Sequence, residues 1–358
     1  AWQALFIITA ISVFIVVLGL AFRAPLLSFI FGKVDADVME NSMVYFFYTV
    51  LSYPFIALYD AGASIFRAQE NTRGPMVISI ISNVMNIVGN GILIWVFHMG
   101  VAGAAISTLV SRIFCAVVVL YQLRKNRQPI VVRDYLKIRP DGKMIGRILA
   151  LGIPSGIENS MFQLGKLAIQ STVSTLGTTA IAAQAMTNML EMLNGTAVIG
   201  VGIGLMTVVG QSLGAGRKDE AVYYMKKLMI FSEVFLIACC AVVYVLARPI
   251  TMIGGMEAKS AEMCLDMMFW ITIVKPIVWM FAFIPAYGMR AAGDVKFSMI
   301  TSCITMWTFR FCLCVYLIRV CGMGPMAVWI GMFTDWTVRA IVFGLRFKSG
   351  KWMEHKVV

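Results

Sequence analysis

Runs of about 20 apolar residues, the length that crosses a bilayer as one helix, recur along the whole chain. Few charges lie between them: 13% of the 358 residues are Asp, Glu, Lys or Arg, whereas an ordinary soluble domain carries about 25%. A soluble protein could not bury the 60% of residues that are apolar and keep so little charge outside. The sequence therefore predicts an all-α polytopic membrane protein.

Turn-forming segments rich in Gly, Asn and charged residues separate ten such spans. Successive crossings place the connecting loops alternately on the two sides of the membrane. The predicted spans cover approximately residues 3–22, 41–65, 75–97, 101–123, 148–176, 180–212, 228–247, 262–288, 298–318 and 324–345.

The basic residues gather on one set of loops. Of the 30 Lys and Arg residues, 20 fall in the loops 66–74, 124–147, 214–227 and 289–297 and after residue 345, against 5 in the opposite set. Because Lys and Arg are retained on the cytoplasmic side, we expect these loops and the C-terminus to be cytoplasmic in a cell-membrane protein. The net charge of +12 then indicates contact with anionic lipid and no nucleic-acid partner.

The chain repeats itself at a spacing of about 223 residues. Segment 66–73 aligns without a gap with 289–296, and Pro54 matches Pro276. The first four spans thus match the last four in the same direction, which is typical of two lobes related by an axis along the membrane normal. We predict an N-terminal lobe (1–125), a basic cytoplasmic linker (126–146), a C-terminal lobe (147–346) and a cytoplasmic tail (347–358).

The fifth and sixth spans have no counterpart in this repeat. The spacing places their expected partners ahead of Ala1. We therefore expect a twelve-span protein of which this sequence holds ten spans, the first two preceding it.

Six short motifs resemble those of the multidrug and toxic compound extrusion (MATE) transporters. In the first half they are RAQENTRGPM (67–76), NVMNIV (83–88) and GVAGAA (100–105), and in the second GIPSGIE (152–158), VGQSLGAGR (209–217) and MRAAGD (289–294). The resemblance covers essentially the whole chain. It implies a twelve-helix, two-lobed exporter of small amphipathic organic compounds, coupled to inward Na+ or H+ flow. It also implies an acid eight residues after Pro154, where this chain has Phe162.

Polar side chains form one stripe on each of the fifth and sixth spans. At 100° per residue, each stripe falls within a narrow face of its helix. The stripes comprise Ser155, Asn159, Gln163, Lys166 and Gln170 on one helix and Gln184, Asn188 and Glu191 on the next. Two facing stripes on adjacent helices predict the wall of a cavity that binds substrate or ion.

Charges within these spans are the candidate functional groups, because charges in the hydrocarbon region are costly. Lys166 and Glu191 lie at the same depth, about 15 Å below the turn that joins their helices. We predict that they pair, either as an ion-coupled switch or as a structural tie. Glu158 either lines the inner mouth or caps a neighbouring helix. For Lys275, beside Pro276, we favour a role facing the cavity over snorkelling.

The leading function is secondary active efflux, by a monomer, through cation antiport with alternating access. The alternative is a lipid-linked saccharide flippase of the same superfamily, which should show a cavity dominated by cations for pyrophosphate. An enzyme is disfavoured because the chain has no HExxH, DDxxD or GxxxxGK[ST] motif. Two isolated histidines and the absence of CxxC spacing predict no metal site and no cofactor.

Overall fold

The computed structural model describes residues 2–31, 36–124 and 140–354. Over these ranges the chain is helical with short turns, and none of it forms a strand. The α-helices are α1 (Trp2–Ala21), α2 (Arg23–Phe31), α3 (Ala36–Leu51), α4 (Tyr53–Ala68), α5 (Arg73–Gly91), α6 (Gly100–Leu123), α7 (Gly142–Val173), α8 (Thr178–Gly214), α9 (Lys218–Ile253), α10 (Ala258–Ala291), α11 (Val295–Thr305), α12 (Leu313–Arg319) and α13 (Met326–Lys348). Four short segments complete them: the π-helices η1 (Ile92–Val96) and η3 (Met306–Cys312) and the 3-10 helices η2 (Ser174–Leu176) and η4 (Lys351–Met353).

Apart from one or two residues at an end, each predicted span falls within one helix or one continuous series of helices. Nine of these are long and apolar enough to cross a membrane. The tenth is α7, whose polar residues include Glu158 and Lys166. The prediction of an all-helical membrane protein is confirmed. Several helices run past their predicted ends: α9 begins ten residues before the predicted 228 because its first turn holds Asp219 and Glu220, acids that suit a helix N-terminus.

The chain forms two compact units, Ala1–Leu149 (unit 1) and Ala150–Val358 (unit 2). The predicted linker, 126–146, lies outside the described residues up to position 139, as do the last four residues of the predicted tail.

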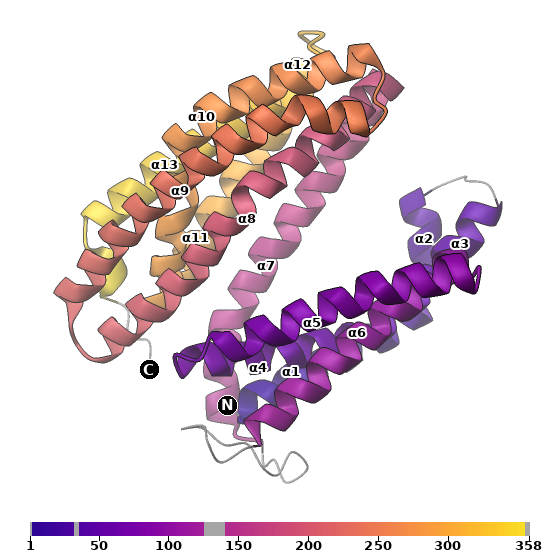
Figure 1. The fold of residues 1–358 in the computed structure, drawn as a ribbon. Helices are drawn as coiled ribbons and strands as arrows, with labels where there is room; N and C mark the ends of the chain where they lie inside the picture. Colours follow the sequence, from indigo (N-terminus) through magenta and orange to yellow (C-terminus); the bar gives the residue numbers. More distant parts are fainter. Residues whose placement is uncertain (1, 32–35, 125–139, 355–358) are drawn as a thin grey trace. The chain divides into compact units, whose positions relative to one another are not determined.

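In unit 1, α6 lies against α4 and α5, and α1 lies against α4 (Figure 1). Small and hydroxyl residues let α5 and α6 approach closely, as is common between membrane helices. The Ser82 hydroxyl donates to the carbonyl of Ser111 at 3.1 Å, and the Ser107 hydroxyl donates to the carbonyl of Asn86 at 3.0 Å. A Cβ on Gly89 would lie only 2.5 Å from Oγ of Ser107, so this seam has no room for a side chain.

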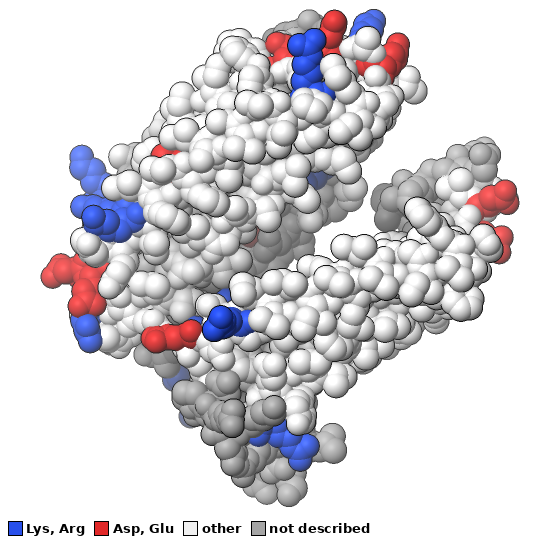
Figure 2. Space-filling model, in the orientation of Figure 1, with Lys and Arg blue, Asp and Glu red and all other residues white. Residues whose placement is uncertain are grey.

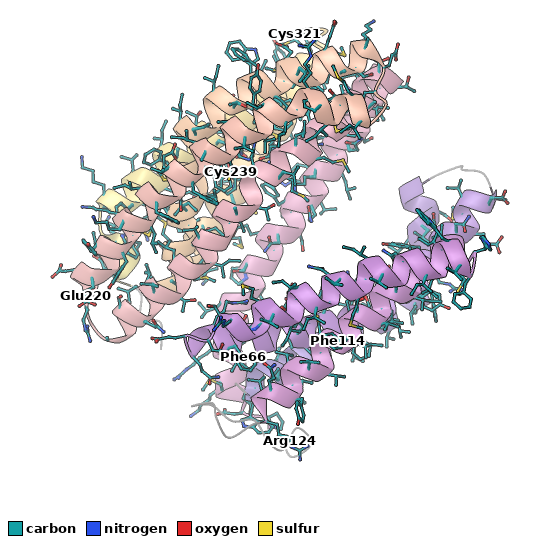
Figure 3. All side chains as sticks on the ribbon, viewed as in Figure 1. Phe66, Phe114, Arg124, Glu220, Cys239 and Cys321 are labelled. Atoms are coloured by element: carbon teal, nitrogen blue, oxygen red, sulfur yellow. The ribbon has the colours of Figure 1, made fainter. Side chains whose placement is uncertain are left out.

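Unit 2 is an up-and-down array of long helices in which α10 packs against α8, α9 and α13. Figure 3 shows Glu220 near one end of the unit, Cys321 at the other, and Cys239 between them on α9. Charged side chains gather at the two ends, and the surface between them is largely uncharged on the face drawn in Figure 2. This pattern is the one that a bilayer requires.

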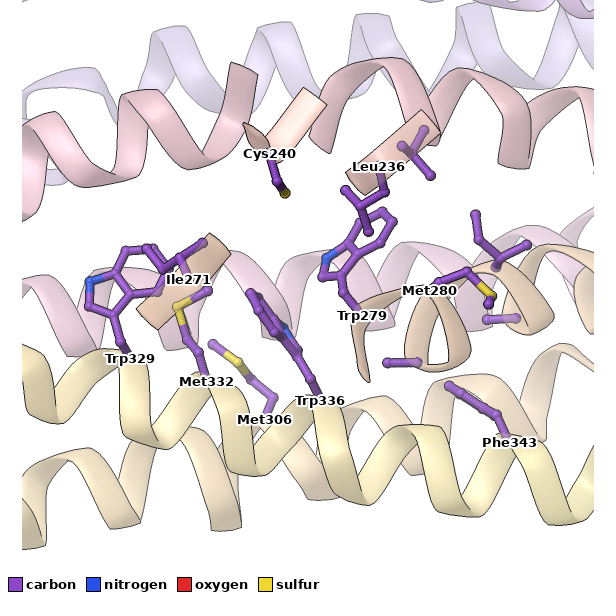
Figure 4. Packing of buried hydrophobic residues seen from close by; sticks show 14 of the residues in the cluster. Leu236, Cys240, Ile271, Trp279, Met280, Met306, Trp329, Met332, Trp336 and Phe343 are labelled. Atoms are coloured by element: carbon purple, nitrogen blue, oxygen red, sulfur yellow. The ribbon is translucent and has the colours of Figure 1, made fainter. Parts of the chain in front are cut away.

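Large apolar side chains fill the interior of unit 2. Trp279, Trp329 and Trp336 are at most 5% exposed and lie between the helices, as Figure 4 shows. Trp336 packs edge-on against Phe283 with ring centroids 6.5 Å apart.

The sequence repeat has a structural counterpart within each unit. The contacts of α1 with α4, of α4 with α6 and of α5 with α6 correspond to those of α9 with α10, of α10 with α13 and of η3 with α13. The third span of each set contains a π-helical segment, η1 or η3. The proline of the second span differs in effect: the helix is interrupted at Ser52, before Pro54, whereas α10 continues through Pro276.

Candidate functional site

Two adjoining cavities open inside unit 2. The first, about 390 Å³, is lined by Arg290, Arg310 and Arg339 and is called the arginine chamber. The second, about 600 Å³, is lined by several amide side chains and is called the amide chamber. The residues common to both chambers are Lys166, Glu191, Met192, Arg310 and Met332. Together the chambers have the size of a site for a drug-sized molecule.

Seven of the eight residues predicted for the site line these chambers. Glu158, Asn159, Lys166 and Glu191 line the arginine chamber, and Gln163, Gln184 and Asn188 line the amide chamber. The eighth, Lys275, is fully buried beneath the wall and lines neither of these chambers. The prediction that Lys275 faces the cavity is therefore wrong for these two chambers, because its long side chain is enclosed between α10 and α8.

Lys275 forms an ion pair with Glu191. Its Nζ lies 2.5 Å from Oε1 of Glu191 and also donates to the Glu191 carbonyl at 3.1 Å and to Oδ1 of Asn194. The three N–H groups of the ammonium are thus matched by three oxygens of α8. The Glu191 side chain is 21% exposed, so one face of the carboxylate borders the chambers while the other holds Lys275.

The predicted pairing of Glu191 with Lys166 is wrong. α8 packs tightly along α10 but not along α7, so the Glu191 carboxylate turns to the lysine of α10. Lys166 points into both chambers, with its Nζ 5.3 Å from the centroid of the Phe162 ring. Among the described residues Lys166 has no ion pair.

Side-chain contacts join α7 to the rest of unit 2. Glu158, which is 7% exposed, accepts a 2.7 Å hydrogen bond from Nη2 of Arg290 near the end of α10. Gly165 faces the side chain of Met306 with no room for a Cβ. Glu158 thus lines the chamber, and its contact with α10 is an ion pair with the Arg290 side chain and not the helix cap that was the alternative prediction.

Three cations surround the ring of Phe162. Arg310 and Arg339 lie 5.1 and 5.5 Å from its centroid, and Lys166 is the third. Cations are attracted to the face of an aromatic ring. An aromatic ring with cationic neighbours thus stands where the family resemblance implies an acid.

The two arginines differ in their partners. Arg339 donates to Oδ1 of Asp335 at 2.7 Å and to the hydroxyl and carbonyl of Ser302 at 3.1 and 3.0 Å. Arg310 is only 6% exposed, and its guanidinium has neither an ion pair nor a hydrogen bond within the described part of the chain. Arg310 is therefore a buried cation whose donors are free for a ligand.

Neutral amides line the second chamber. Gln184 is 2% exposed: its amide nitrogen donates to Oδ1 of Asn188 at 3.3 Å, and its oxygen accepts from the indole N–H of Trp329 at 3.1 Å. Gln163 and Gln170 face the chamber from α7. This chamber can hydrogen-bond a polar group without adding charge.

The three arginines of the arginine chamber were not among the predicted site residues. Arg310 and Arg339 lie within the predicted spans 298–318 and 324–345, so the high cost of an intramembrane charge was a signal that could have identified them. Arg290 lay in a motif at a predicted loop. Among the described residues, no three His, Cys, Asp or Glu side chains are arranged to hold a metal ion.

The sequence matches the family model described as MatE over residues 1–92 and 154–316. The chain belongs to the MatE family. This confirms the resemblance of the motifs to MATE transporters and identifies the protein as a membrane transporter and not an enzyme.

Curated MatE relatives match along nearly the whole chain. "Probable multidrug resistance protein NorM" of Thermotoga maritima is 25% identical over 372 residues, which cover all of this chain and 77% of the relative. "Uncharacterized transporter YisQ" of Bacillus subtilis is 26% identical over 346 residues, which cover 93% of this chain and 73% of the relative.

A solved structure shows the same fold. A multidrug resistance MATE family transporter of the MOP superfamily, in its outward-facing conformation, superposes with a TM-score of 0.86 at 18% identity. The match covers 98% of this chain and 78% of that one.

Proposed function

We propose that this MatE protein exports small amphipathic organic compounds across the cell membrane by cation antiport with alternating access. The observation that carries the proposal is the Glu191–Lys275 ion pair in the wall of a substrate-sized cavity. Buried intramembrane ion pairs of this kind mark ion pathways and proton relays. The names of several relatives, among them the Thermotoga maritima protein, support organic drugs as the substrate class.

The geometry favours H+ over Na+ as the coupling ion. A sodium ion needs several free oxygen ligands and a net negative charge. Here the carboxylate of Glu191 and the amide oxygen of Asn194 already bind the Lys275 ammonium. A proton needs only the free lone pairs of Glu191, whose side chain borders both chambers.

Protonation of Glu191 would change the charge balance of its ion pair with Lys275. The neutral carboxyl no longer compensates the charge of Lys275, which is fully buried. A buried cation without its counter-ion is strongly unfavourable, so protonation favours a rearrangement of α8 against α10. In the proposed cycle, this rearrangement links proton entry to substrate release.

The test is efflux of dyes from proteoliposomes that contain the purified protein. Separate pH and Na+ gradients are imposed, and cationic and anionic dyes are loaded in parallel. We expect the pH gradient to drive efflux of at least one dye and the Na+ gradient to drive none. Failure of both gradients to move any dye would contradict the antiport proposal.

The second candidate is a flippase for lipid-linked saccharides. It is favoured by one observation, the four cations that line the arginine chamber: Lys166, Arg290, Arg310 and Arg339. A flippase would move a fluorescent lipid-linked pyrophosphate between leaflets, and no dye efflux would accompany it.

We also propose that the protein acts as a monomer with its C-terminus in the cytoplasm. The basic end of unit 2, where α9 begins and α13 ends, supports this orientation.

A further inference from the structure

We infer that the arginine chamber takes an amphipathic organic anion, whose acidic group binds between Lys166 and Arg310. This inference rests on the proposed export function and adds the charge class of the substrate. The charges of the chamber, the burial of Arg310 and the aromatic lining support it.

The charges around the chamber do not cancel. Arg290 is paired with Glu158, Arg339 with Asp335, and Lys275, behind the wall, with Glu191. Lys166 and Arg310 remain without an acidic partner among the described residues. The chamber therefore carries two positive charges in excess, which favours an anionic ligand.

These two cations border one small volume. Both lie beside the Phe162 ring, with Nζ of Lys166 at 5.3 Å and the guanidinium carbon of Arg310 at 5.1 Å from its centroid. Both line the arginine chamber and the amide chamber, so they stand where the two meet. A carboxylate, sulfonate or phosphate at this junction can meet both charges.

Arg310 is built as a binding group. It is 94% buried, and its Nε–H has no acceptor in the part of the chain that the structure describes. A guanidinium N–H that is buried without an acceptor is costly, and an anion supplies that acceptor. The backbone is also held in place, because a Cβ on Gly331 of α13 would lie 2.9 Å from the Arg310 carbonyl oxygen.

The rest of the arginine chamber suits an aromatic body. Trp279, Phe283, Tyr287, Trp336 and Phe343 line it, and the 390 Å³ volume matches a fused-ring molecule. A chamber with cations at one end and aromatic walls along the rest suits an amphipathic anion, whose acidic group meets the cations and whose aromatic body meets the walls. Soluble aromatic acids and the pyrophosphate of a lipid-linked compound share this chemistry.

The test uses two dyes with the same xanthene ring system and opposite charge, 5-carboxyfluorescein and rhodamine 123. Binding to the purified full chain is followed by fluorescence anisotropy. We expect carboxyfluorescein to bind at least about tenfold more tightly than rhodamine 123, the effect of one charged hydrogen bond. Preference for rhodamine 123 would overturn the inference and leave the export proposal standing.

Variants locate the site. Lys166→Gln should weaken carboxyfluorescein binding by about tenfold, and Lys166→Glu should reverse the preference toward rhodamine 123. Lys259→Gln, at an exposed lysine of α10, is the matched control and should change neither affinity. Because loss of Arg310 could disturb folding, Arg310→Lys is compared with Arg310→Gln, and only the lysine variant should keep measurable binding. Binding that is unchanged in both Lys166 variants would overturn the assignment.

Competition separates the two sources of the anion. Displacement of the dye by farnesyl pyrophosphate supports a lipid-linked pyrophosphate, and displacement by naphthalene sulfonates alone supports a soluble aromatic acid. Binding of carboxyfluorescein without gradient-driven efflux of any dye would support this inference and contradict the antiport proposal.

Discussion

The ammonium of Lys275 lies 2.5 Å from the carboxylate of Glu191, although 84 residues separate them in the chain. Lys275 is fully buried, and its hydrogen bonds all go to oxygens of α8. This single contact ties α10 to α8 at the wall of the cavity. Glu191 is therefore an acid that is paired with Lys275 and also lines both chambers.

Removing one member of this pair should destabilise the protein more than removing both. Lys275→Met leaves Glu191 without its counter-ion, a loss of about 3 kcal/mol for a buried pair. Adding Glu191→Gln should recover part of that stability, because no uncompensated charge remains. Thermal unfolding of the two single variants and the double variant in detergent measures this coupling. Additive effects of the two substitutions would show that the pair contributes nothing as a pair.

Gly195 should be required for the same contact. A Cβ at this position would lie 3.1 Å from Nζ of Lys275, so Gly195→Ala pushes the ammonium away from α8. We expect a lower unfolding temperature and weaker pH-driven efflux. Gly200→Ala on the same helix meets nothing within 4 Å and should behave as wild type. Equal behaviour of the two variants would contradict the tight packing described here.

Gln184 should stabilise the packing of α8 against α13 through its hydrogen bond with Trp329. Gln184→Leu leaves the buried indole N–H of Trp329 without an acceptor, which costs about 1–3 kcal/mol. Gln170→Leu, at an exposed glutamine where α7 borders the same chamber, is the control and should change the unfolding temperature little. Intrinsic tryptophan fluorescence during thermal unfolding reports on both variants. A stable Gln184→Leu protein would mean that the Trp329 indole finds another acceptor.

Gly331 should set the position of Arg310. Gly331→Ala places a methyl group 2.9 Å from the Arg310 carbonyl oxygen, which forces η3 away from α13. We expect loss of carboxyfluorescein binding together with some loss of stability. Gly344→Ala, on the same helix with open space around it, provides the comparison. Retained dye binding in Gly331→Ala would show that Arg310 does not depend on this close approach.

Cys321 tests the orientation in the membrane. It is exposed and lies at the end of unit 2 opposite Glu220 (Figure 3). In a variant whose other seven cysteines are replaced by alanine, a membrane-impermeant maleimide added to intact cells should label Cys321. A cysteine introduced at Ser349, after α13, should stay unlabelled until the membrane is opened. The reverse pattern would place the C-terminus outside.

The helices and the polar stripes could be predicted from the sequence because each follows from local periodicity. Apolar runs define the spans, and the 3.6-residue repeat placed Asn159, Gln163 and Lys166 on one face of α7. The partner of Glu191 could not be predicted in this way. Lys166 and Lys275 both lie within predicted spans, and only the packing of α8 on α10, with α7 standing apart, selects Lys275.

A second physical reason explains why the arginine chamber could not be predicted from the sequence. Arg310 lies in η3, a π-helical segment that changes the helical register, so a regular 100° progression misplaces its side chain. Arg290 and Arg339 become chamber residues through α10 and α13, elements that are distant from α7 in sequence. Local sequence patterns cannot show that residues distant in the sequence line the same chamber.

The role of the Glu191–Lys275 pair in coupling is decided by the rate of dye efflux from proteoliposomes under an imposed pH gradient. Wild type is compared with Glu191→Gln and with Glu262→Gln, at an exposed acid of α10. We predict that the gradient accelerates efflux in wild type and Glu262→Gln and has no effect in Glu191→Gln. Gradient-driven efflux of equal rate in all three would show that Glu191 is only a structural tie and that protons are coupled elsewhere or not at all.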